Sequence, residues 1–285
     1  MVWVQGFNPP IIEGVVRRAV TMGLPVSILD DQSTPDFRVR LTGLERTAYF
    51  GMAQSSRCGE AVARYLTRLG HRRVAFISPF HRHAWSRTRL EGVQTAIGQV
   101  SGARVDAYVS QEASPLAGSM ERVRQVQRSV EIVLRREADE PEVLPGGVRS
   151  RIADVMARLE KLRETGGVRL YGGLLESALA AGGTTAWIAV NDLTAVECIR
   201  FLAARGVDVP SRISVVGFDD TLDASLSNLT SYNFNGTAVV SAMLSHLLSP
   251  PSLPRAQRGR VVELEGFVSV RATSAAPAQG LLSGR

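Results

Sequence analysis

The sequence has few cysteines, no long apolar run and no secretory leader. It contains 2 Cys, Cys58 and Cys198, whose separation fits neither a metal motif nor a disulfide framework, so we expect two buried thiols in a reducing compartment. Apolar stretches such as Ala186 to Val190 are far shorter than the roughly 18 residues of a membrane span. The first ten residues lack a basic start, an apolar stretch and a small-residue cleavage site. We therefore expect a soluble, cytoplasmic protein without membrane contact.

Motifs of common enzyme classes are missing as well. None of the predicted strands is followed by Gly-x-Gly-x-x-Gly or a phosphate loop, and the sequence has no Gly-x-Ser-x-Gly elbow. His81 and His83 lie two positions apart without an evident third ligand, which favours a loop over a metal site. We expect no catalytic activity, no metal and no cofactor. An α/β enzyme with Asp219 or Asp192 as its base is the weaker alternative.

The composition is that of an ordinary globular protein with a modest basic excess. The 285 residues correspond to about two domains at roughly 150 residues each. The net charge of +6 comes largely from Arg on predicted helical faces, interleaved with Glu and without aromatic residues for base stacking. This pattern favours solvated helix faces over a nucleic-acid-binding patch.

Apolar periodicity predicts alternating strands and helices. We expect strands at 2–5, 25–29, 74–78, 186–190 and 213–218, and helices at 11–22, 57–69, 86–97, 193–205 and 237–248. Because helices separate the strands, the connections are crossovers, and the fold class is α/β with doubly wound parallel sheets. Asp192 is expected to cap helix 193–205, Asp220 to cap or form a turn, and His246 to lie on a helix surface.

The pattern changes between residues 115 and 167, where two charged amphipathic segments flank a breaker-rich loop at 140–147. The first stripe contains Val123, Val126, Val130 and Val133, and the second contains Ile152, Val155, Met156, Leu159 and Leu162. They predict a helical hairpin inserted in the α/β fold. The stripes could pack on each other, on the host domain or on a partner.

Polar and aromatic residues follow the predicted strands. Ligands of parallel sheets bind beyond the carboxyl ends of the strands, where Phe80, Asn191 and Asp219 lie, with Trp85 and Arg89 in or beside the first turn of a following helix. A carboxylate, a guanidinium and flat aromatic faces suit a hydroxyl-rich small molecule. Trp85 is equally consistent with a core position.

Four stretches in order resemble the effector domain of the LacI/GalR transcription regulators. They are GEAVARYLTRLGHRRVAFIS at 59–78, RLEG at 89–92, TAWIAVNDLTA at 185–195 and VPSRISVVGFDD at 209–220. Residues 229–232 and 270–274 resemble that family's last lobe crossing and final strand. Residues 7–10 and the loop at 78–86 further resemble the subset headed by a GntR-type winged helix.

The resemblance implies a two-lobed, periplasmic-binding-protein-like fold that closes on a small effector, such as a sugar or related polyol, in its cleft. Closure would respace the DNA-binding heads of a homodimer, and no such head precedes the effector motifs in this chain. By position, the ligand contacts implied are Arg89, Asn191 and Asp219, with His83, Trp85, Arg57 and Phe234 also lining the pocket.

The resemblance also implies how the lobes are divided. The first lobe would comprise 1–71 and 234–257, and the second 72–233 and 258–275, with the insertion at about 115–167, a flexible tail at 276–285 and crossings near Arg72, Asn233 and Arg258. The chain would start at the third strand of the first lobe, so we expect an N-terminal truncation and an incomplete first lobe. The alternatives are the solute-binding protein of a sugar transporter and a protein-interaction module with a vestigial cleft.

Overall fold

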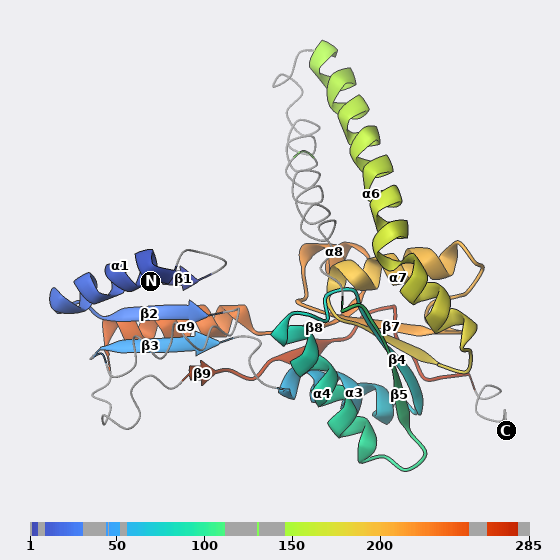
Figure 1. The fold of residues 1–285 in the computed structure, drawn as a ribbon, viewed down its shortest axis with the longest axis horizontal. Coiled ribbons are helices and arrows are strands. Elements are labelled where there is room, and N and C mark those ends of the chain that lie inside the picture. The colour runs from blue at the N-terminus through green and yellow to red at the C-terminus, as the bar shows by residue number, and fades with distance from the viewer. Residues whose placement is uncertain are drawn as a thin grey trace.

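The computed structural model describes residues 2–4, 9–30, 44, 46–51, 56–111, 130, 146–250 and 261–278. These residues build two separate β-sheets, each with helices on both faces, joined by segments that cross from one sheet to the other (Figure 1). No helix among them is both long enough and apolar enough to cross a membrane.

The first sheet is parallel throughout, in the order β1-β2-β3-β9. Its strands are β1 (Val2–Val4), β2 (Val26–Asp30), β3 (Thr47–Gly51) and β9 (Val261–Glu263). Helix α1 (Pro9–Thr21) packs on one face through Val16, and α9 (Gly236–Leu248) packs on the other through Val239 and Met243. The hydroxyl of Ser27 on β2 donates to the Met243 carbonyl at 2.9 Å, which ties α9 to the sheet.

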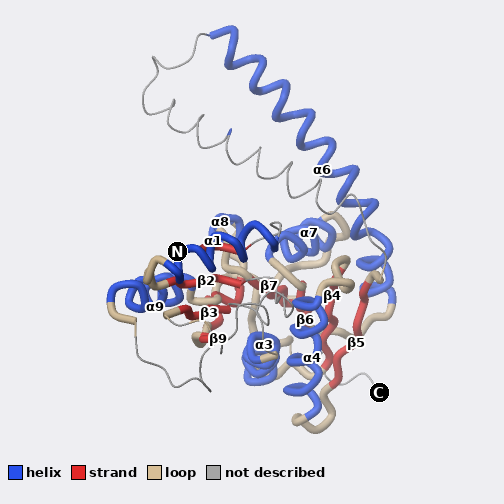
Figure 2. The backbone as a smooth tube through the Cα atoms, turned by 60° about the vertical axis from the view of Figure 1, so that its left-hand side comes forward, coloured by secondary structure: helices blue, strands red, loops and turns tan. Residues whose placement is uncertain are grey.

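The second sheet runs β10-β8-β7-β6-β4-β5, and only β10 is antiparallel to its neighbour. Figure 2 shows β7, β6, β4 and β5 of this sheet. Its strands are β4 (Arg73–Ser78), β5 (Arg104–Val109), β6 (Ala186–Ala189), β7 (Ser214–Phe218), β8 (Thr230–Asn233) and β10 (Phe267–Ser269). Side chains alternate between its two faces. Phe76 faces helices α3 (Arg57–Arg68) and α4 (Ala84–Gly98), whereas Ile77 faces α6 (Gly146–Ala180) and α7 (Asp192–Ala203).

The doubly wound α/β fold with two sheets is the one predicted, and the expected helices and strands in the described residues begin and end within two residues of the observed ones. The final strand differs. It is β10 at Phe267–Ser269, whereas residues 270–274 form no strand. There the carbonyl of Thr273 accepts from the Val215 amide at 2.7 Å, and its hydroxyl accepts from the Thr230 amide at 2.9 Å.

Helix α6 is longer than the predicted second arm of the hairpin. It continues through Gly166 and Gly167 to Ala180, and it projects from the second sheet (Figure 1). Its last turns pack under the sheet through Tyr171 and Leu175, which explains why the helix does not end at the two glycines. The first amphipathic segment lies outside the described residues except for Val130.

Two of the crossings between the sheets lie at other points than expected. Val62 and Leu66 of α3 pack on the second sheet with α4, so residues 57–71 lie with the second sheet rather than the first. Strand β9 pairs with β3 of the first sheet, so the chain crosses between β9 and β10, beyond Arg258. It also crosses between β3 and α3 and between β8 and α9.

His246 was expected on a helix surface, and the structure corrects this. Its side chain is buried, its Nε2 lies 3.1 Å from the Arg46 carbonyl oxygen, and its ring meets the edge of Phe50. Cys58 and Cys198 are buried free thiols, as expected. His71 lies at the junction of α3 and β4, where its ring nitrogens contact the Thr185 hydroxyl and the Ala275 carbonyl.

Two glycines allow α3 and α4 to approach at backbone distance. A Cβ on Gly59 would overlap the carbonyl oxygen of Arg89, and a Cβ on Gly92 would overlap the carbonyl oxygen of Ser56. The reciprocal contact fixes the depth and rotation of α4 on the sheet, and with them the position of Arg89.

We predict that Gly92→Ala destabilises the chain by about 1 to 3 kcal/mol, because the added methyl group has no space between the helices. Gly98→Ala on the same helix is the matched control. Nothing lies within 4 Å of a Cβ there, so that variant should be neutral or slightly stabilising. Urea unfolding measures both changes, and equal stabilities of the two variants would contradict the close approach.

Candidate functional site

Arg89 occupies the centre of the predicted site, at the carboxyl ends of the parallel strands β6 and β7. Its side chain extends from the second turn of α4, and the residue is only 5% exposed. Nη1 donates to the Val190 carbonyl at 2.5 Å, and Nη2 lies 3.1 Å from Oδ1 of Asp219. Sequence analysis placed Arg89 and Asp219 at one site, and the structure brings them into an ion pair.

Three aromatic rings surround the guanidinium. Arg89 Cζ lies 5.0 Å from the ring centre of Trp85, 4.9 Å from that of Phe218 and 5.0 Å from that of Phe234. Each ring face attracts the cation, which offsets part of the free energy lost when the charge leaves water. Trp85 and Phe234 were predicted site residues. Phe218 was missed, although it directly precedes Asp219 and its side chain ends a buried strand.

The guanidinium of Arg89 has a further hydrogen-bond donor, Nε. Among the described residues, its Nε is buried without a hydrogen-bond partner. An unsatisfied buried donor costs about 1 to 3 kcal/mol, so this atom is a candidate contact for a ligand. The side chain of Asp219, the ion-pair partner of Arg89, is 38% exposed and so accessible from solvent.

The loop between β4 and α4 adds further aromatic faces. The His83 and Trp85 rings stack at 5.5 Å with an interplanar angle of 19°, and Phe80 lies 6.0 Å from Trp85. The hydroxyls of Ser78 and Ser86 lie 2.7 Å apart and hold this loop. The loop thus places the rings of His83 and Phe80 against Trp85, which in turn contacts the guanidinium.

His81 supports the same loop from inside. Its Nδ1 lies 3.2 Å from the Ser86 hydroxyl, and burial, with the nearby charge of Arg87, lowers the pKa of its ring. The described residues contain no cluster of three or more His, Cys, Asp or Glu side chains able to hold a metal. His81 thus contacts the loop through the Ser86 hydroxyl.

The remaining predicted residues have other surroundings. Asn191, not Asp192, is the N-cap of α7, since its side-chain oxygen accepts from the Thr194 amide at 2.9 Å. Arg57 is exposed in the first turn of α3 and is absent from the described contacts of Arg89. Ligand contact by Arg89, Asp219, Asn191, Trp85, His83, Phe80, Arg57 and Phe234 stays a prediction.

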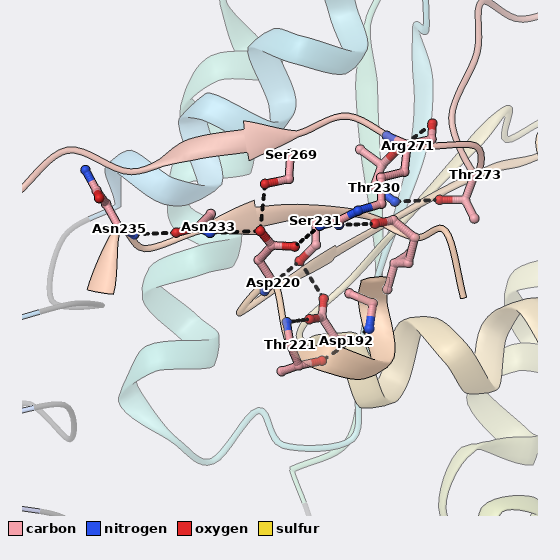
Figure 3. Close-up of polar contacts among 12 residues, drawn as sticks. Asp192, Asp220, Thr221, Thr230, Ser231, Asn233, Asn235, Ser269, Arg271 and Thr273 are labelled. Carbon is pink, nitrogen blue, oxygen red and sulfur yellow. Dashed lines mark hydrogen bonds and ion pairs between the residues drawn. The ribbon is translucent and has the colours of Figure 1, made fainter. Parts of the chain in front are cut away.

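Asp192 is the first residue of α7 and is buried behind Asp219. Its Oδ1 accepts from the Ser231 hydroxyl at 2.5 Å, and its Oδ2 accepts from the Thr221 amide at 2.7 Å (Figure 3). Burial raises the pKa of Asp192 to about 7, and the charge of Asp219 acts in the same direction against these hydrogen bonds. Sequence analysis gave this residue the wrong role, because its partners lie 29 and 39 positions away.

Comparison with known proteins places the fold. Residues 141–274 match the family described as the periplasmic binding protein-like domain. A LacI transcriptional regulator from a Rhodococcus species has a TM-score of 0.54 at 18% identity, with 97% of this chain and 78% of that chain covered. A LacI family regulator from Enterococcus faecalis V583 with bound ribose has a TM-score of 0.53 at 17% identity, with 96% and 77% covered. The chain therefore shares the fold of these regulators.

One curated relative is an uncharacterized HTH-type transcriptional regulator in the aml 5' region of Streptomyces limosus. It is 28% identical over 158 residues, which are 55% of this chain and 31% of the relative. The chain thus spans about a third of that relative's length.

We predict that Asp192 makes stability fall as the pH rises. Its pKa is about 7 in the folded chain, above its ordinary value of 3.8, so the folded state holds a proton that the unfolded state has released between those two values. Asp192→Asn removes this term. The free energy of unfolding of the variant minus that of the parent chain should therefore increase by about 2 kcal/mol as the pH is raised from about 5 to 7.5.

Urea unfolding at several pH values measures this difference, with Asp154→Asn on the exposed part of α6 as the control. The other titrating groups, including His71 and His81, contribute equally to parent and variant and cancel. Parallel pH profiles for the parent chain and Asp192→Asn would show that the buried carboxyl titrates normally.

Proposed function

We propose that this chain, which has the fold of the LacI/GalR effector domains, is the ligand-sensing domain of a bacterial transcriptional regulator. The observation that carries the proposal is the buried Nε of Arg89, a donor without a described partner beside the accessible carboxylate of Asp219. A donor and an acceptor side by side match two neighbouring hydroxyl groups. The aromatic rings of Trp85, His83 and Phe80 suit the C–H face of a sugar or related polyol.

The ligand would bind by forming hydrogen bonds with both members of the Arg89–Asp219 ion pair. A hydroxyl oxygen accepts from Arg89 Nε, and a neighbouring hydroxyl donates to the carboxylate of Asp219. Because the chain crosses between the sheets on both sides of this region, a molecule held by both sheets would favour a closed arrangement. The ribose bound to the E. faecalis regulator supports a sugar as the first candidate.

The proposal includes partners outside this chain. A regulator of this class acts in the cytoplasm as a homodimer and binds DNA through a separate head domain. The HTH-type regulator of S. limosus supports this assignment, since this chain spans about a third of its length. Ligand-driven closure would then alter the spacing of two such heads.

Isothermal titration calorimetry against neutral pentoses and hexoses, with D-ribose among them, tests the proposal. For a sugar that binds, we expect Arg89→Gln and Asp219→Asn each to weaken the affinity about tenfold to a hundredfold, the loss of one charged hydrogen bond. Asp219→Asn is the safer variant, because its side chain is partly exposed and the change is isosteric.

Arg158→Gln and Asp154→Asn on the exposed part of α6 are matched controls and should leave the affinity unchanged within about twofold. A bound sugar that keeps its affinity in both site variants would reject the assignment of the site. Absence of heat across the whole panel would reject the sugar.

A further inference from the structure

Asp219 and Asp220 are consecutive and have opposite surroundings. Both have a left-handed backbone, with φ of 102° and 48°, which non-glycine residues adopt only when neighbouring groups hold them. The Asp219 side chain faces Arg89 and is 38% exposed, whereas that of Asp220 is 8% exposed. The strained turn thus presents one carboxylate to the site and directs the other into the protein.

Three side chains contact the carboxylate of Asp220 (Figure 3). Its Oδ2 accepts from Asn233 Nδ2 at 2.8 Å and from the Ser269 hydroxyl at 2.7 Å, while its Oδ1 lies 2.7 Å from Arg271 Nη2. Burial alone would raise the pKa of Asp220, but the hydrogen bonds from Ser269, Asn233 and Arg271 together with the charge of Arg271 lower it. These contacts therefore favour the ionised form of the carboxylate, which is a strong acceptor.

Two of these three partners border the crossings between the sheets. Asn233 ends β8, immediately before the chain passes to α9, and Ser269 ends β10, shortly after the chain returns from β9. A single oxygen of Asp220 thus holds the outgoing and the returning segment together.

The hydrogen bonds continue into the crossings themselves. Asn233 Oδ1 accepts from the Asn235 amide at 2.6 Å, and Asn235, with a φ of 56°, donates from Nδ2 to the Glu265 carbonyl at 3.3 Å. On the returning segment the Gly266 amide donates to the Tyr232 hydroxyl at 3.1 Å. A continuous path therefore leads from Asp220 to residues in both crossings.

We propose that Asp220 is a positioning residue that joins the ligand-facing Asp219 to both crossings and so links occupancy of the site to the geometry of the hinge. The link to a ligand rests on the proposed function. The link from Asp220 to the crossings does not, and it can be tested without any ligand.

Hydrogen exchange measured by mass spectrometry on the ligand-free chain tests that link. In Asp220→Ala, we expect amides in peptides covering 233–238 and 263–268 to exchange about tenfold faster than in the parent chain, because the network that orders them is lost. Asp220→Asn keeps one acceptor oxygen and should restore part of the protection. Asp154→Asn is the control and should change nothing.

Faster exchange confined to 219–224, or an equal acceleration in every peptide, would overturn the proposal, since the first result shows a local effect and the second a loss of global stability. Ser269→Ala removes a single donor to Asp220 and keeps the test decisive if Asp220→Ala does not fold. It should accelerate exchange in 263–268 without changing the peptides of α7.

Calorimetry with D-ribose tests the link between Asp220 and the ligand site. If the parent chain binds D-ribose, Ser269→Ala should weaken that binding about threefold to tenfold, because the hydroxyl lost acts through Asp220. Unchanged affinity would overturn the coupling to the site while leaving the proposed function intact. If the parent chain does not bind D-ribose, that result counts against ribose alone, and the exchange experiment still decides the link to the crossings.

Discussion

A guanidinium withdrawn from water requires acceptors and counter-charge close by, and Arg89 creates this requirement at one end of the second sheet. The groups that meet it are the Val190 carbonyl, the Asp219 carboxylate and the rings of Trp85, Phe218 and Phe234. They come from the ends of β6, β7 and β8 and from α4. A single side chain thereby specifies how four segments meet, and among the described residues its Nε is the guanidinium atom without a hydrogen-bond partner.

The location of this charge depends on backbone packing elsewhere. Gly59 and Gly92 let α3 and α4 approach until each glycine faces a carbonyl of the other helix. Because the carbonyl that Gly59 faces belongs to Arg89, a larger residue at position 59 would move the guanidinium away from Val190 and Asp219. The glycines serve the site through helix packing rather than through a phosphate-binding turn, which agrees with the absence of a glycine-rich motif after any predicted strand.

The sequence predicted the parts of the fold that have strong local signals. Amphipathic helices and the buried strands β4 and β6 were found, whereas the partly exposed edge strand β5 and the buried strand β3 were missed. Gly166 and Gly167 indicated a break, but packing of the following turns keeps α6 continuous. Asn191 and Asp192 can both cap a helix, and only the distant partners Ser231 and Thr221 decide between them. The site pair Arg89 and Asp219 was predicted because both follow parallel strands, whose ends must share one edge.

The neighbouring aspartates show why a ligand-facing carboxylate benefits from a rigid anchor. Asp219 is already paired with Arg89, so an incoming hydroxyl competes with an existing ion pair, and a freely moving loop would let the carboxylate follow the guanidinium or retreat into water. The amide of Asp219 donates to the Tyr232 carbonyl at 3.0 Å and that of Asp220 to the Ser231 hydroxyl at 3.0 Å, which holds the left-handed turn in place. With the backbone fixed, the side chain of Asp219 can change partners while its Cα stays still. In the proposed site, the ion pair would give way to two hydroxyl contacts, and the buried carboxylate of Asp220 would keep that exchange local.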